Sequence, residues 1–130
     1  MKNKLALIFG ISGQDGSYLA DFLLKKRYKV IGVTRNTTKK NLFRLTKLNI
    51  DKRITVFKTK ETNHQTIKKI FKKFKNIDEI YYLSGETSPL NSMNYPLQTF
   101  EGNVNNLIFI LEYLRLKRLK TKFFYASSSE

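Results

Sequence analysis

Residues 5–24 read LALIFGISGQDGSYLADFLL, and this stretch decides the fold of the chain. The apolar run 5–9 predicts a buried strand, and the stretch 17–24 predicts a helix. Between them, Gly10, Gly13 and Gly16 stand three residues apart. Glycines in this pattern can allow a tight turn after the strand, a backbone that touches a pyrophosphate, and close packing of the helix on the sheet. We therefore expect a phosphate to bind at the helix N-terminus, where free N–H groups and the helix dipole favour anions.

Apolar runs alternate with helical patterns along the rest of the chain, which predicts a parallel sheet with helices on its faces. The expected strands are Lys4–Phe9, Lys29–Thr34, Ile54–Phe57, Glu79–Leu83 and Lys122–Ala126. The expected helices are Gly16–Lys26, Asn41–Leu48, Gln65–Lys75 and Leu97–Leu116. Because parallel crossovers are right-handed, the fold class is α/β, with a doubly wound, Rossmann-like parallel sheet.

Size and composition indicate one soluble domain. The chain has 130 residues, of which 41% are hydrophobic. No apolar run reaches the roughly 18 residues of a membrane span, and the N-terminus lacks a signal-peptide core, so we expect a cytoplasmic protein. The chain has no cysteine and one histidine, His64, which excludes disulfides and histidine clusters for a metal. We expect His64 to lie at the surface.

The formal net charge of +15 raises the possibility of a nucleic-acid partner. The lysines are spread over most of the chain and are not interleaved with exposed aromatic residues, so we expect neither a nucleic-acid nor a membrane partner. A basic surface would still attract an anionic substrate such as a nucleotide sugar.

The end of the second expected strand predicts which dinucleotide binds. In this fold an acidic residue at that position bonds the 2′-hydroxyl of NAD, whereas an arginine accommodates the 2′-phosphate of NADP. The chain has Arg35, followed by Asn36 and Thr37, and no carboxylate there. We therefore expect NADP in preference to NAD; a solvated loop cation is the alternative for Arg35.

The ends of the fourth and fifth strands carry small polar residues. Residues 83–88 read LSGETS and would form a wall beside the cofactor, although a plain turn would look the same. The chain closes on residues 127–130, SSSE, where alternation puts Ser128 and Glu130 on one side. A hydroxyl and a carboxylate so placed suit hydrogen bonding and general acid/base catalysis, with a turn or helix cap as the alternative.

The glycine loop, residues 10–20, resembles that of the extended short-chain dehydrogenase/reductase family and, within it, the GDP-mannose 4,6-dehydratases, since GxSGQDG is more specific than the glycines alone. Further matching segments are 33–35, 41–45, 78–83, 96–104 and 124–130. The resemblance covers the whole chain but only about the first third of a family enzyme. It implies an incomplete NADP-binding domain over residues 1–130, truncated after the fifth strand, with the substrate-binding domain absent.

The resemblance implies a lyase that converts GDP-mannose to GDP-4-keto-6-deoxymannose, with NADP taking hydride from sugar C4 and returning it to C6. Ser128 would bond the C4 hydroxyl, and Glu130 would handle the C5 proton and the departing C6 hydroxyl. The catalytic Tyr-x-x-x-Lys pair would follow the fifth strand. Tyr113 and Lys117 have the same spacing but come before the fifth strand. They lie on a helix whose apolar face is needed for packing, so we assign them no catalytic role. A full-length enzyme would be a homo-oligomer.

The implied cofactor-binding residues lie in the glycine loop and at the ends of the second, third and fourth strands: Gly10, Ile11, Ser12, Gly13, Gln14, Asp15, Gly16, Arg35, Asn36, Thr37, Lys60, Glu61, Leu83, Ser84, Gly85 and Thr87. Two positions depart from the family pattern: Lys60 replaces an aspartate that meets the adenine, and Glu86 replaces an amide. Another epimerase or reductase of nucleotide sugars, or a catalytically inactive NADP-binding remnant, therefore remains an alternative.

Overall fold

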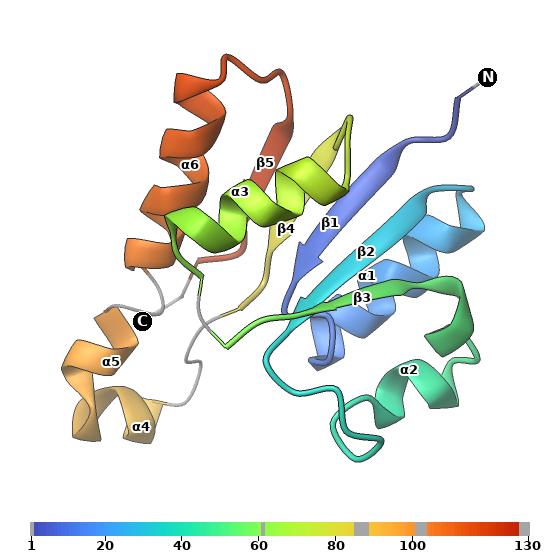
Figure 1. Ribbon diagram of the computed structural model, residues 1–130. Coiled ribbons are helices and arrows are strands. Elements are labelled where there is room, and N and C mark those ends of the chain that lie inside the picture. The colour runs from blue at the N-terminus through green and yellow to red at the C-terminus, as the bar shows by residue number, and fades with distance from the viewer. Residues whose placement is uncertain (1, 61, 85–88, 101–103, 128–130) are drawn as a thin grey trace.

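Five parallel strands form one sheet in the order β3-β2-β1-β4-β5 (Figure 1). The computed structural model describes residues 2–60, 62–84, 89–100 and 104–127. The strands are β1 Leu5–Phe9, β2 Lys29–Thr34, β3 Thr55–Lys58, β4 Glu79–Tyr82 and β5 Lys122–Tyr125. The order reverses beside β1, as in a doubly wound fold, so the predicted fold class is confirmed.

The helices are α1 Gln14–Lys25, α2 Phe43–Lys47, α3 His64–Lys73, α4 Pro89–Asn94, α5 Pro96–Phe100 and α6 Asn106–Leu116, with a 3-10 turn, η1, at Asp51–Arg53. The prediction of one helix over Leu97–Leu116 is wrong. Helix α5 ends at Phe100, and α6 begins at Asn106 after a π-helical turn at 104–105. Residues 101–103 lie outside the described part of the chain, and apolar spacing alone does not show where one helix gives way to the next.

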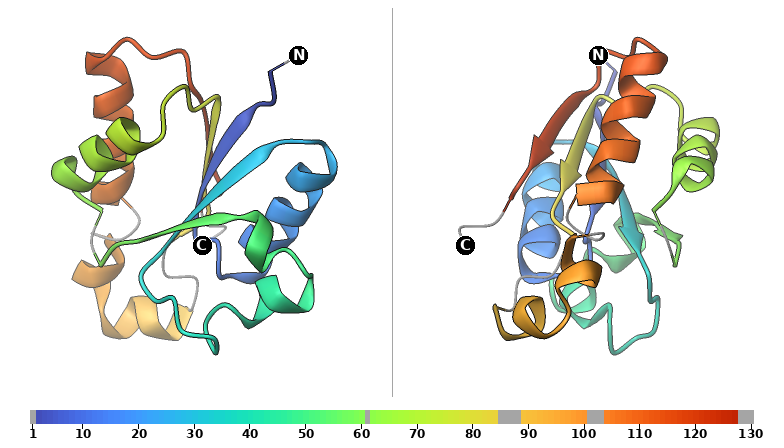
Figure 2. Two further views of the ribbon diagram at one scale, coloured as in Figure 1. Left: turned by 45° about the vertical axis from the view of Figure 1, so that its right-hand side comes forward. Right: turned by 90° about the vertical axis from the view of Figure 1, so that its left-hand side faces the viewer.

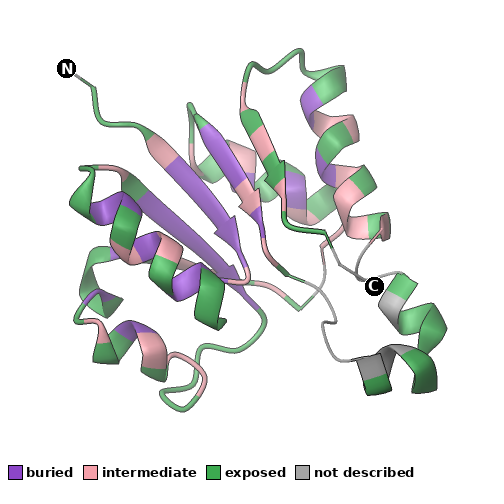
Figure 3. Ribbon diagram, turned by 180° about the vertical axis from the view of Figure 1, so that it is seen from behind, coloured by how far each residue is buried: buried purple, intermediate pink, exposed green. Residues whose placement is uncertain are grey.

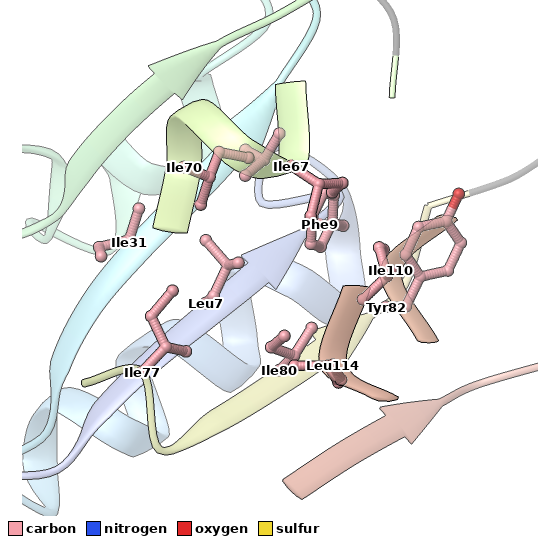
Figure 4. Packing of buried hydrophobic residues seen from close by; sticks show 11 residues of the cluster. Leu7, Phe9, Ile31, Ile67, Ile70, Ile77, Ile80, Tyr82, Ile110 and Leu114 are labelled. Atoms are coloured by element: carbon pink, nitrogen blue, oxygen red, sulfur yellow. The ribbon is translucent and has the colours of Figure 1, made fainter. Parts of the chain in front are cut away.

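The two faces of the sheet are covered by different helices (Figure 2). On one face, α1 and α2 pack over a cluster that includes Ala6, Ile8 and Leu45. On the other, α3 and α6 pack over Leu7 and Phe9 together with other buried residues: Ile31, Val33, Ile67, Ile70, Ile77, Ile80, Tyr82, Ile110 and Leu114 (Figure 4). Alternate residues of β1 therefore enter different cores, as the two-residue period of a strand requires.

Three helices end in the same backbone motif. After α1, α2 and α6, the C′ residue has a positive φ: Arg27 at 65°, Asn49 at 57° and Arg118 at 52°. In each case the next residue donates its backbone N–H to the carbonyl oxygen five residues back; Leu119 N, for example, donates to Leu114 O at 3.0 Å. This is a Schellman motif, in which glycine is the usual C′ residue. Arginine at two of these positions strains the backbone.

Arg118→Gly is expected to raise the free energy of unfolding by about 0.5–1 kcal/mol. It removes the left-handed penalty of about 1–2 kcal/mol, and the greater freedom of glycine in the unfolded chain offsets part of the gain. Urea denaturation measures the effect. The control is Lys117→Gly at the preceding position, where φ is −86° and glycine should lower stability. Equal destabilisation by both variants would show that the positive φ carries no strain.

Candidate functional site

The carboxyl ends of the five parallel strands meet at one edge of the sheet, which is where ligands bind in doubly wound folds. The glycine loop follows β1, Arg35 follows β2, Thr59 and Lys60 follow β3, and Leu83 follows β4. Tertiary structure thus brings together segments that lie far apart in the sequence.

Steric crowding explains two glycines of the loop. Gly10 has a φ of +87°, and a Cβ there would lie 3.0 Å from the carbonyl carbon of Leu83 at the end of β4. At Gly16 a Cβ would lie 2.1 Å from the carbonyl oxygen of Gly10. Gly10 thus serves the turn and Gly16 the close approach of α1 to the loop, two of the roles that the spacing predicts.

Gly13 has no comparable packing role. A Cβ there would meet only the carbonyl oxygen of Gly10, at 3.4 Å, and its φ of −75° suits any residue. Gly13 is the exposed N-cap of α1 and makes no side-chain capping bond. The first hydrogen bond of α1 runs from Ser17 N to Gly13 O at 3.0 Å, and the Gly13 N–H donates to Gly10 O at 3.1 Å. The amides of Gln14, Asp15 and Gly16 therefore have no helical carbonyl to bond and face out of the helix end. A phosphate could approach these amides closely.

Gly32, in the middle of β2, is a site that the sequence analysis did not single out. A Cβ at Gly32 would lie 2.4 Å from the Ile11 side chain, which is fully buried. Ile11 therefore serves the core through its side chain, and only its backbone belongs to the loop. A lone glycine inside a strand pattern was the available signal of this close approach.

A small hydrogen-bond network shapes the corner after β2. The Thr34 hydroxyl bonds the Asn36 carbonyl oxygen at 3.2 Å and faces the Ser12 hydroxyl at 3.5 Å. The side-chain amide of Asn41 donates to both the Thr34 hydroxyl and the Asn36 carbonyl oxygen. Asn36 Oδ1 accepts the backbone N–H of Thr38 at 2.9 Å. This network links the corner to the glycine loop and leaves Arg35, Asn36 and Thr37 exposed.

Arg44 is a second basic residue at this corner. One of its guanidinium nitrogens donates to the Ser12 carbonyl oxygen at 3.2 Å, across the glycine loop, and the guanidinium lies 4.6 Å from the Phe43 ring centre. The sequence analysis quoted Arg44 only as part of a matching segment. Sequence spacing could not predict the hydrogen bond between Arg44 and Ser12, because 32 residues separate them.

The end of β4 carries a buried tyrosine beside the same edge. Burial raises the pKa of the Tyr82 hydroxyl, while a hydrogen bond with Asn106 and the positive charge of Arg35 lower it. Burial outweighs these effects, so the pKa of Tyr82 lies above its ordinary value.

The structure describes some of the remaining residues that the sequence assigns to the site, and others lie outside its described part. Gln14, Asp15, Lys60 and Ser84 are exposed at the edge, and Leu83 is half-buried. The expected residues that lie outside the described part of the chain are Glu61, Gly85, Glu86, Thr87, Ser128 and Glu130.

Other expectations concern residues away from this edge. His64 is exposed at the start of α3, as expected. The Tyr113 ring stacks on Phe71 of α3 with 4.7 Å between ring centres, which is a packing contact. Over the described ranges there is no group of three or more metal-binding side chains and no helix long and apolar enough to cross a membrane.

The sequence and the fold both have known relatives. A family model described as GDP-mannose 4,6 dehydratase matches residues 7–130. The GDP-mannose 4,6-dehydratase of Vibrio cholerae serotype O1 is 36% identical over 137 residues, which cover 100% of this chain and 36% of that protein. The chain thus spans about a third of the length of this relative.

Solved structures of nucleotide-sugar epimerases share the fold. The UDP-Glc/GlcNAc 4-epimerase of Campylobacter jejuni superposes with a TM-score of 0.81 at 21% identity, covering 98% of this chain and 38% of that one. A mutant of UDP-glucuronic acid 4-epimerase from Bacillus cereus, solved with a UDP-sugar analogue and NAD, gives a TM-score of 0.72 at 22% identity, covering 93% and 39%.

Gly16→Ala is expected to destabilise the fold, whereas Gly13→Ala is tolerated. The first places a methyl group against backbone and should lower the free energy of unfolding by at least about 2 kcal/mol. The second adds a methyl group in ordinary contact and should change it by less than about 1 kcal/mol. Thermal or urea unfolding of both variants measures the difference. Similar losses in the two variants would contradict the distinct roles assigned to these glycines.

Proposed function

The chain belongs to the GDP-mannose 4,6-dehydratase family, and on this basis we propose that it is the NADP-binding part of a nucleotide-sugar dehydratase. In this proposal residues 1–130 form the cofactor domain, and GDP-mannose is the substrate of the complete enzyme.

The main support for the proposal is that packing requires two of the three loop glycines but not the third. Packing accounts for Gly10 and Gly16 but leaves Gly13 unexplained. Gly13 stands at the exposed N-cap of α1, where the helix dipole and free amides favour an anion. A pyrophosphate against this backbone would account for a glycine that the fold itself does not need.

Arg35 supports NADP as the dinucleotide. It is exposed immediately after β2, and the described corner around it offers hydroxyl and amide groups in place of a carboxylate. A guanidinium can pair with the 2′-phosphate through two parallel hydrogen bonds. Arg44 donates a hydrogen bond to the Ser12 carbonyl oxygen and adds a second positive charge to the corner.

The chemistry proposed for the complete enzyme begins at this edge. Bound NADP supplies a hydride acceptor and donor, so that the dehydration involves no net oxidation. In this chain the loop amides and Arg35 hold the phosphates, Ser128 bonds the sugar C4 hydroxyl, and Glu130 moves the C5 proton and protonates the departing C6 hydroxyl. Lys60 stands where the family has an acid beside the adenine, and it leaves base recognition to other groups.

NADP is expected to bind the chain at least about tenfold more tightly than NAD, and Arg35→Ala should remove most of that preference. Hydrogen bonds to a charged group contribute about 1.5–3 kcal/mol, which corresponds to about 10- to 150-fold in the dissociation constant for NADP. NAD affinity should stay within about twofold. Isothermal titration calorimetry with both dinucleotides measures these values.

Lys40→Ala is the matched control for Arg35→Ala, because Lys40 is an exposed cation of the same loop. An equal loss in both variants would show that Arg35 contributes only general positive charge. Tighter binding of NAD than of NADP by the parent chain would overturn the cofactor assignment.

Glu130→Gln is expected to reduce GDP-mannose turnover at least about 100-fold without changing NADP affinity, because it removes a general acid/base while keeping the shape of the side chain. The measurement uses a chimera that joins residues 1–130 to the remaining part of the Vibrio cholerae relative. Glu112→Gln, in α6, is the control. Unchanged turnover in the Glu130 variant would exclude this role.

A further inference from the structure

Helix α2 places a basic side chain against the glycine loop. Helices α1 and α2 lie on the same face of the sheet, and α2 is exposed or half-buried at every position but one (Figure 3). That position is Leu45, which is fully buried in the same core cluster as Ile11 of the loop. The packing of Leu45 therefore fixes α2 beside the loop and brings the preceding residue, Arg44, within reach of it.

Arg44 bonds one particular peptide unit of the loop. Its guanidinium donates to the Ser12 carbonyl oxygen at 3.2 Å. The N–H of the same peptide unit belongs to Gly13 and donates to the Gly10 carbonyl oxygen at 3.1 Å. The peptide unit that joins Ser12 to Gly13 is therefore held at both of its polar groups, once by the loop itself and once by α2.

This peptide unit stands directly before the proposed anion site. The amides of Gln14, Asp15 and Gly16 have no helical carbonyl to bond, and they are the groups that would meet a pyrophosphate. Successive amides bind an anion when their N–H groups converge on it. A carbonyl oxygen that turned in among them would repel the anion. By bonding the Ser12 carbonyl oxygen, Arg44 keeps that oxygen directed toward α2.

The Arg44 side chain is itself held in place. Its guanidinium lies 4.6 Å from the Phe43 ring centre, a cation–π contact that restricts its movement. Within the described part of the chain, the ion pairs involve other cations, and the recorded hydrogen-bond partner of Arg44 is a neutral carbonyl. Charge pairing therefore does not explain the placement of Arg44, whereas the geometry of the loop does.

We propose that Arg44 is a positioning residue for the pyrophosphate site, which orients the glycine loop through the Ser12 carbonyl and does not itself recognise the 2′-phosphate. The inference rests on the proposed cofactor site and gives the two arginines of the corner different roles. Arg35 distinguishes NADP from NAD, whereas Arg44 raises the affinity for both, because both carry the pyrophosphate. A loop that is ordered before the ligand arrives loses less conformational freedom on binding.

Three probes separate these roles: NADP, NAD, and 2′-AMP, which carries the 2′-phosphate but no pyrophosphate. Arg44→Met removes the donor and keeps an unbranched side chain next to the Phe43 ring. Its affinities for NADP and NAD should fall by a common factor of about 3- to 10-fold, the usual effect of losing one hydrogen bond. Its affinity for 2′-AMP should stay within about twofold, because loss of a screened, unbonded charge changes binding little. Isothermal titration calorimetry measures all three affinities.

Lys47→Met is the matched control, because Lys47 is an exposed cation of the same helix and its ammonium group lies 5.8 Å from the same Phe43 ring centre. This variant should leave all three affinities within about twofold of the parent values. Loss of NADP and 2′-AMP binding with NAD binding unchanged in Arg44→Met would overturn the proposal, since Arg44 would then be a ligand of the 2′-phosphate. Equal losses in the two variants would also overturn it, since general positive charge would then account for the effect.

A measurement without cofactor keeps this inference distinguishable from the proposed function. Hydrogen exchange followed by NMR compares the amide of Gly13, in the loop, with that of Leu7, in the buried strand β1. Arg44→Met should raise the Gly13 exchange rate at least about fivefold relative to Lys47→Met and leave the Leu7 rate unchanged. That result without NADP binding would contradict the cofactor assignment and support the ordering of the loop by Arg44. Unchanged exchange at Gly13, or faster exchange at both amides, would overturn the positioning role.

Discussion

The close approach of two backbone segments at the β1–α1 turn is the constraint on which the rest of the structure depends. The carbonyl oxygen of Gly10 lies 2.1 Å from the position that a Cβ of Gly16 would take. This approach allows α1 to begin directly against the loop and to pack along the sheet. It also directs the unbonded amides of the first turn of α1 toward the edge where the other strands end. A single steric requirement thereby sets both the core contact of α1 and the position of the proposed anion site.

Around this turn the structure separates two kinds of glycine that look identical in the sequence. Gly10, Gly16 and Gly32 are required by the fold, since a side chain would strike backbone or the buried Ile11. Gly13 is not, and its freedom from packing makes it the best marker of a ligand. At the corner after β2, Thr34 and Asn41 order the loop, and Arg35 and Arg44 bring positive charge to it.

The hydrophobic cores on the two faces of the sheet differ in extent. The core over α3 and α6 extends from β2 to β5, whereas the core over α1 and α2 stops short of β5. The edge that would hold the cofactor thus stands on a part of the sheet that is packed on both of its faces.

By itself, the sequence determined the α/β class, the five strands to within one residue at each end, and the strand–glycine–helix unit, because these depend on local periodicity and on glycine spacing. It also marked Arg35, since the residue after the second strand has a defined place in this fold. Only the tertiary structure decided what depends on contacts between distant residues: the Arg44–Ser12 bond and the buried pairing of Gly32 with Ile11. Local patterns cannot report these features, because each depends on which distant residues come together when the chain folds.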